Sequence, residues 1–173
     1  IPWDANIGLL YYRKDLLEKY NLDTPQTWDE LVKACVKISS GEHIYGYLWQ
    51  GKQYEGLVCN FIEFIGSNTG EIIEDTGRII VDSEQNKIAL DFMHDLIWEH
   101  QVSPQNTHSE LMEESSRHLF QQGKGLFLRN WTYVWKLCQD DPLMKGKVGV
   151  SLLPKFSDGN PASVYGGWHL AIN

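Results

Sequence analysis

The sequence lacks long hydrophobic runs and is poor in basic residues. No apolar stretch approaches the ~20 residues that cross a bilayer. Lys and Arg total 15 against 23 Asp and Glu, which gives a net charge of −8. Because nucleic acids are bound by clustered Lys and Arg, this balance argues against a nucleic-acid partner. Hydrophobic and charged contents of 42% and 22% are ordinary for a globular protein.

Cysteine is also scarce. The three cysteines, Cys35, Cys59 and Cys138, form no closely spaced pair. This pattern indicates neither a disulfide framework nor a zinc site. All three lie in apolar helical patterns, so we expect them to be small core residues. They leave the cellular compartment open.

Signatures of catalysis are missing as well. The chain has no G-x-S-x-G, P-loop, H-E-x-x-H or C-x-x-C motif. His94 and His100 are six residues apart on a predicted helix, which places them on different faces and favours a solvated surface over a metal site. Glu113 and Glu114 are expected on a helix surface. A glycosidase needs two carboxylates at a set separation across a cleft, which a sequence does not display. We therefore expect no enzyme, no metal and no cofactor, and keep a glycosidase-like enzyme as an alternative.

Predicted strands alternate with predicted helices, which indicates one α/β domain over residues 1–173. The start of one helix is marked by Thr27 and Glu30, a T-x-x-E capping box. Both ends of the chain look cut from inside a larger protein. The predicted strands are 7–12, 44–50, 125–129 and 147–153, the predicted helices are 13–20, 27–41, 54–65, 83–100, 109–123 and 130–138, a hairpin surrounds 75–77, and 163–172 is strand-like.

Aromatic residues are abundant, with seven Trp and eight Tyr. Several of them fall where a predicted strand gives way to a helix. Tyr54 follows the second strand, and Trp131 and Tyr133 follow the third. In open α/β sheets, ligands lie beyond the carboxyl ends of the strands, and helix N-termini there offer free N–H groups. These three rings are therefore candidates for ligand contact.

Core packing competes with ligand binding as the explanation for each ring. The pattern leaves the two open for Tyr54, Tyr133 and Trp168. Trp168 follows Gly166 and Gly167, which would let the backbone approach a ligand closely. Core packing is favoured for the tryptophans within predicted helices or the sheet, which are Trp28, Trp49, Trp98 and Trp135.

Four segments together resemble one protein family. They are NIGLLYYRKDLLEKYNLDTPQTWDELVKACVKI, YGYLWQGKQYEGLVCNFIEFIGSNTGEI, FQQGKGLFLRNWTYVW and KVGVSLLP…YGGWHLAIN. They resemble extracellular solute-binding proteins of ABC importers, in the sugar-binding class that includes maltose- and trehalose/maltose-binding proteins. The resemblance implies an α/β lobe of a two-lobe, type II periplasmic-binding-protein-like fold, with a mixed sheet flanked by helices. It also implies that this segment is the central part of the second lobe.

The resemblance assigns roles to the candidate rings. Tyr54 and Tyr133 match aromatics that stack on sugar rings, and Trp131 flanks the second of these. Trp168 and the two glycines before it match a sugar-contacting Gly-Gly-Trp turn. Rings cover the C–H-rich faces of a sugar by apolar burial.

Polar residues would then pair with the sugar hydroxyls, which must not be buried unpaired. Asn6 matches a hydroxyl-binding position that is often acidic in relatives. Because Asn donates as well as accepts hydrogen bonds, this difference leaves the exact sugar open. Further candidates are Trp3, Asp4, Gln53, Arg129 and Asn130.

The implied protein is a monomeric receptor for a disaccharide or oligosaccharide that delivers its ligand to membrane permease subunits. It would lie in the periplasm or on the extracellular face, and lipid anchoring is left open. Two other hypotheses belong to different classes. One is a carbohydrate-active enzyme with an aromatic subsite, and the other is a peptide-recognition module that uses an aromatic patch.

Overall fold

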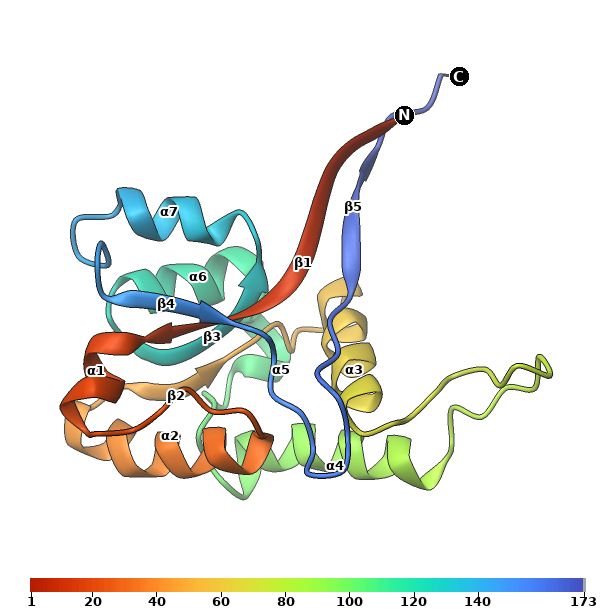
Figure 1. Ribbon diagram of the computed structural model, residues 1–173, viewed down its shortest axis with the longest axis horizontal. Helices are drawn as coiled ribbons and strands as arrows, with labels where there is room; N and C mark the ends of the chain where they lie inside the picture. Colours follow the sequence, from red (N-terminus) through yellow and green to blue (C-terminus); the bar gives the residue numbers. More distant parts are fainter. Residues whose placement is uncertain (173) are drawn as a thin grey trace.

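The computed structural model describes residues 1–172, which form a mixed α/β fold (Figure 1). The class and the mixed sheet agree with the prediction. The strands of the described residues are β1 (Pro2–Arg13), β2 (Tyr45–Leu48), β3 (Gly125–Trp131), β4 (Val148–Ser151) and β5 (Tyr165–His169). The helices are α1 (Lys14–Lys19), α2 (Trp28–Glu42), α3 (Glu55–Ser67), α4 (Glu84–Trp98), α5 (Thr107–Glu110), α6 (Glu113–Gln121) and α7 (Val134–Asp140).

The sheet is organised around β1. Its main path is β2-β3-β1-β4, and β5 also pairs with β1. β1 runs antiparallel to β3, β4 and β5, whereas β2 and β3 are parallel. Residues 8–12 of β1 pair with β3 inside the body of the fold, while residues 2–7 pair with β5. The outer part of β1 therefore pairs with β5, and its inner part lies between β3 and β4.

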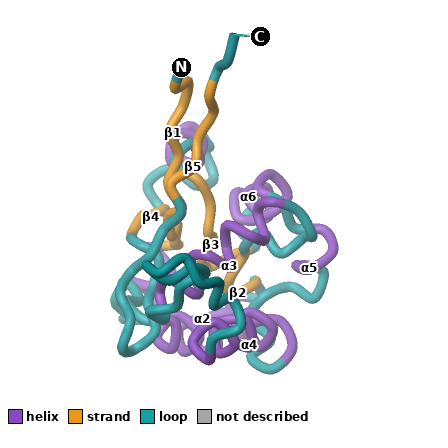
Figure 2. The backbone as a smooth tube through the Cα atoms, turned by 90° about the vertical axis from the view of Figure 1, so that its right-hand side faces the viewer, coloured by secondary structure: helices purple, strands orange, loops and turns teal. Residues whose placement is uncertain are grey.

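The outer half of β1 and strand β5 form a two-stranded ribbon that stands away from the body and carries both chain ends (Figures 1 and 2). Large apolar side chains on it are exposed, including Trp3 and Trp168 at 72% each. The sequence predicted only residues 7–12 of β1, because the outer half is stabilised by a partner strand 160 or so residues away and not by a local pattern.

The sheet is covered on both faces. Successive residues of a strand point to opposite sides, and Leu10 packs in one apolar cluster while Tyr11 packs in the other. The first cluster joins the sheet to α2, α3 and α4, and the second joins it to α6 and α7 (Figure 1). All three cysteines are buried and unpaired, as predicted.

The start of α2 follows the predicted capping box. The Thr27 hydroxyl oxygen accepts from the backbone N–H of Glu30 at 3.2 Å, and the Glu30 carboxylate accepts from the N–H of Thr27 at 3.2 Å. The next residue, Trp28, is 2% exposed and stacks on Phe64 with ring centres 4.3 Å apart. Its indole N–H donates to the hydroxyl of Ser67 at 3.0 Å. The cap thus fixes the start of α2, where Trp28 packs against α3.

The predicted boundaries around α6, β3 and α7 were also wrong. The predicted helix 109–123 is divided into α5 and α6, because Leu111 and Met112 are extended and the N–H of Met112 donates to Ser115 Oγ at 2.8 Å, which starts a new helix. The predicted strand 125–129 continues to Trp131, since Trp131 pairs with Gly8 of β1. Trp131 therefore lies in a strand, and α7 begins only at Val134.

The expectation of core packing holds for two tryptophans and fails for two. Trp28 and Trp49 are each 2% exposed, whereas Trp98 and Trp135 are 41% and 44% exposed. Trp135 follows the buried Val134, and one residue along a helix turns the side chain by about 100°. Its ring therefore leaves the face that α7 packs against the sheet.

Candidate functional site

A cavity of about 680 Å³ lies where the ribbon meets the body of the fold. Residues of β1 and β5 line one side, and the beginnings of α3 and α6 and the end of β3 line the rest. The cavity-lining residues that the sequence predicted as binding residues are Asp4, Asn6, Tyr54, Trp131, Tyr133, Gly166, Gly167 and Trp168. The fold thus gathers most of the candidates from four separate stretches of chain into one place.

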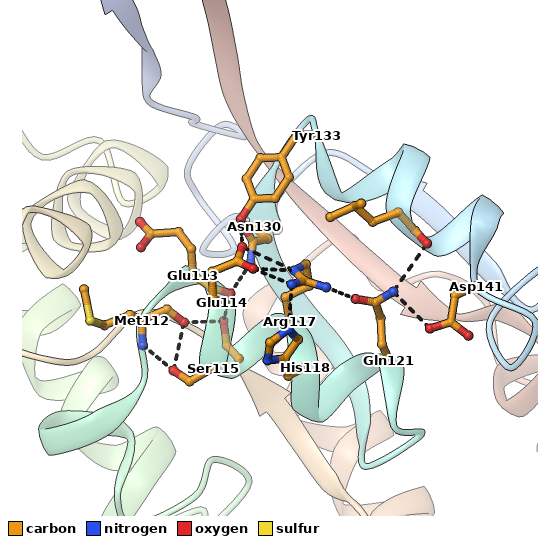
Figure 3. Close-up of polar contacts among 12 residues, drawn as sticks. Met112, Glu113, Glu114, Ser115, Arg117, His118, Gln121, Asn130, Tyr133 and Asp141 are labelled. Carbon is orange, nitrogen blue, oxygen red and sulfur yellow. Dashed lines mark hydrogen bonds and ion pairs between the residues drawn. The ribbon is translucent and has the colours of Figure 1, made fainter.

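The other candidates lie elsewhere. Trp3 lines a second hollow along the ribbon, together with Asp4 and Trp168. Asn130 is fully buried, and its amide donates to the carbonyl of Glu113 at 3.0 Å (Figure 3). Gln53 is exposed in the turn before α3 and does not line the cavity.

Glu113, the first residue of α6, holds two of the rings. Its carboxylate accepts from the hydroxyl of Tyr54 at 2.6 Å and from the indole N–H of Trp131 at 3.3 Å. Burial, reinforced by this carboxylate, raises the pKa of Tyr54 above its ordinary value. The Tyr54 hydroxyl therefore stays protonated and remains a donor.

Glu114 holds the third ring. Its carboxylate accepts from the Tyr133 hydroxyl at 2.7 Å and also pairs with Arg117 (Figure 3). The hydrogen bond from Arg117 lowers the pKa of Glu114, so the carboxylate is ionised at neutral pH. Burial and the contact with Glu114 raise the pKa of Tyr133. Tyr133 is the residue that precedes α7, with its ring 37% exposed at the cavity.

Arg129 lies beneath the cavity and does not line it. Its guanidinium makes two hydrogen bonds to the carboxylate of Glu63, at 2.6 and 2.8 Å, and both side chains are almost completely buried. Burial disfavours the charged form, but the bonds to Glu63 outweigh it and raise the pKa of Arg129. Arg129 also lies over the ring of Trp131. The structure thus gives Arg129 a supporting position, and of the two residues only Trp131 lines the cavity.

The polar edge of the cavity is provided by β1. The amide of Asn6 donates to the carboxylate of Asp4 at 2.7 Å, and its oxygen accepts from the Thr132 hydroxyl at 2.8 Å. These two bonds fix which end of the Asn6 amide faces which neighbour. The edge therefore offers an oriented amide and a carboxylate next to the rings.

Gly167 is required by the ribbon itself. Its φ is +153°, and a Cβ at this position would lie 2.1 Å from the carbonyl oxygen of Asp4 on the paired strand. At Gly166, by contrast, a Cβ would lie 3.5 Å from the ring of Trp131, an ordinary contact. The close approach that Gly167 permits is thus between two strands.

Sequence reasoning missed several cavity-lining residues. Glu113 was expected on a helix surface, and nothing in its local sequence shows that α6 packs its first residue beside β3. Glu55, Cys59 and Tyr165 also line the cavity. Tyr165 stands next to the Gly-Gly pair, and its aromatic character was the one available signal. Within residues 1–172, no group of three or more His, Cys, Asp or Glu side chains is arranged to hold a metal ion. No helix in that range is long and apolar enough to cross a membrane.

Comparison with known proteins defines the class. The profile of the family described as bacterial extracellular solute-binding protein matches residues 1–173, and the chain belongs to this family. The predicted family is thereby confirmed.

Three similar proteins show how much of the family's length this chain covers. A probable ABC transporter-binding protein from Deinococcus radiodurans is 39% identical over 181 residues, which is 100% of this chain and 42% of the relative. Maltose-bound MalE3 from T. maritima has 48% identity and a TM-score of 0.93, over 97% of this chain and 43% of that one. A tagatose-bound solute-binding protein from Thermotoga lettingae has 32% identity and a TM-score of 0.85, again over 97% and 43%. The chain therefore spans less than half the length of these relatives.

Proposed function

We propose that this chain is the central part of the second lobe of a sugar-binding receptor of an ABC importer. The observation that carries the proposal is the gathering of four rings, Tyr54, Trp131, Tyr133 and Trp168, around one cavity. Solved structures of the family with maltose and with tagatose support a sugar as the ligand class. The partial coverage of these relatives supports a longer protein with a second lobe.

The composition of the cavity suits an uncharged disaccharide or oligosaccharide. The rings cover the C–H faces of successive sugar units, each with about 1.5–3 kcal/mol of burial free energy when fully covered. Asp4, Asn6 and Glu113 supply acceptors and a donor for the hydroxyl rim. The site would select one sugar over another by pairing every buried hydroxyl, because each unpaired hydroxyl costs about 1–3 kcal/mol of binding free energy.

The ligand would be shared between this lobe and the second lobe. Trp3 and Trp168 on the ribbon are exposed, and in this proposal the partner lobe covers them when it closes. A sugar that contacts both lobes stabilises the closed state, and importer permease subunits would then recognise that state. We place the receptor in the periplasm or on the extracellular face, as a monomer that leaves its ligand chemically unchanged.

A titration of the full-length protein tests this proposal. Tryptophan fluorescence is followed against maltose, other disaccharides, tagatose, polyols and short peptides, and the recovered ligand is analysed by chromatography. We expect saturation by one sugar class with the sugar recovered intact. Recovery of cleaved sugar would favour the glycosidase-like enzyme, and saturation only by peptides would favour the recognition module.

A further inference from the structure

One carboxylate, that of Glu113, connects two rings from different elements. Tyr54 is 59 residues before it at the start of α3, and Trp131 is 18 residues after it at the end of β3. Each ring uses a different carboxylate oxygen, Oε2 for Tyr54 and Oε1 for Trp131. Moving this carboxylate would therefore release both rings from their common anchor.

Glu113 is itself held in place from the protein side. Its backbone carbonyl accepts from the amide of the buried Asn130 at 3.0 Å (Figure 3). The same carbonyl accepts from the hydroxyl of Ser116 at 3.0 Å. Asn130 directly precedes Trp131 in β3. The same stretch of β3 therefore holds the backbone of Glu113 and carries the ring of Trp131. Glu113 makes no ion pair within the described residues, in contrast to Glu114, which pairs with Arg117.

The carboxylate of Glu113 can still accept hydrogen bonds from a ligand. A carboxylate has about four lone-pair positions, and two of those of Glu113 are used by the rings. The Tyr54 hydroxyl donates to Glu113, so its oxygen remains free to accept from a sugar hydroxyl. Both groups line the cavity.

We propose that Glu113 is a positioning residue that preforms the Tyr54 and Trp131 wall of the sugar site and completes it as a hydroxyl acceptor. This inference rests on the proposed function, because the wall is assigned to a sugar. Rings that are already fixed before binding lose little side-chain entropy when the ligand arrives. The carboxylate thus acts on affinity through the two rings as well as by direct contact.

Glu113→Gln in the full-length protein tests the proposal, with Glu55→Gln as the matched control. Both variants remove one negative charge from the cavity lining, but Glu55 makes no hydrogen bond to a ring. The first readout is the indole N–H resonance of Trp131 in the sugar-free protein, assigned with Trp131→Phe. The second is the affinity for the sugar that the unmodified protein binds, measured by calorimetry, with thermal unfolding as the control for stability.

We expect Glu113→Gln to shift the Trp131 indole resonance and to weaken sugar binding by about tenfold or more, because hydrogen bonds to a charged group are among the strong ones. Glu55→Gln should leave the resonance in place and weaken binding less. An unmoved resonance, or equal affinity losses in the two variants, would overturn the proposal. If no sugar binds the unmodified protein while the resonance still shifts in Glu113→Gln, the proposed function fails and the anchoring by Glu113 stands.

Discussion

The guanidinium of Arg129 lies over the ring of Trp131, with its central carbon 4.0 Å from the ring centre. A cation at this distance is attracted by the ring face, and the attraction is stronger where water is excluded. Arg129 is fully buried and held by Glu63, so the cation does not move with solvent. Trp131 lines the cavity, whereas Arg129 and Glu63 do not. A buried ion pair thus supports a ring of the candidate site without lining the cavity itself.

Removal of one partner of this pair should destabilise the fold. Glu63→Gln leaves the Arg129 charge buried without its counter-ion, and we expect a loss of about 3 kcal/mol in the free energy of unfolding. Urea denaturation of the full-length protein measures this loss. Asp140→Asn is the control, and its loss should be near zero because the Lys136–Asp140 ion pair is largely exposed. Similar small losses for both variants would contradict the supporting role of the pair.

The two ribbon glycines should respond differently to alanine. Gly167→Ala forces a Cβ against the carbonyl of Asp4 and should cost about 1–3 kcal/mol of stability or displace β5 from β1. Gly166→Ala adds only an ordinary contact with Trp131 and should be tolerated. Thermal unfolding of the two variants side by side checks this. Equal unfolding midpoints for Gly166→Ala and Gly167→Ala would contradict a steric requirement for glycine at position 167.

The rings at the cavity should matter for binding more than the exposed rings elsewhere. Tyr133→Ala and Trp168→Ala each remove apolar cover from the sugar, and we expect affinity losses of about tenfold to a hundredfold. Trp98→Ala serves as the control, because Trp98 is 41% exposed and does not line the cavity. Calorimetry at matched stability measures the three. A loss for Trp98→Ala as large as the others would mean that the effect is general and does not come from the site.

The three buried thiols should differ in reactivity. Burial raises the pKa of Cys138 to about 11, so roughly one part in a thousand is thiolate at pH 8, and burial raises the pKa of Cys35 as well. Burial raises the pKa of Cys59 too, but Cys59 lines the cavity, and we therefore expect it to be alkylated first and to be protected by bound sugar. Mass spectrometry of the native protein after timed alkylation identifies the order. Faster labelling of Cys138, or no protection of Cys59, would contradict the placement of the cavity.

The sequence anticipates features that depend on local chemistry. The Thr27–Glu30 box is written within four residues, and the positions of Tyr54 and Tyr133 after strands follow from the order of elements. The rings of Trp98 and Trp135 were misjudged, because the apolar pattern of an amphipathic helix does not reveal how wide its buried face is. The role of Glu113 was missed for a different reason. It depends on contacts with Tyr54, 59 residues away, that only the packed fold creates.

The same distinction applies to the ribbon. Gly166 and Gly167 were predicted to admit a ligand, and the requirement at Gly167 comes from Asp4 on β1. A glycine signals that a close approach is needed, but the sequence does not say what approaches. The pairing of β1 with β5 supplies that information.

A crystal structure of the full-length protein with its bound sugar tests the central claim most directly. We expect sugar density in this cavity, in contact with the rings of Trp131, Tyr133 and Trp168 and within hydrogen-bond distance of Glu113. Sugar bound at another place, with these rings in contact only with protein, would contradict it.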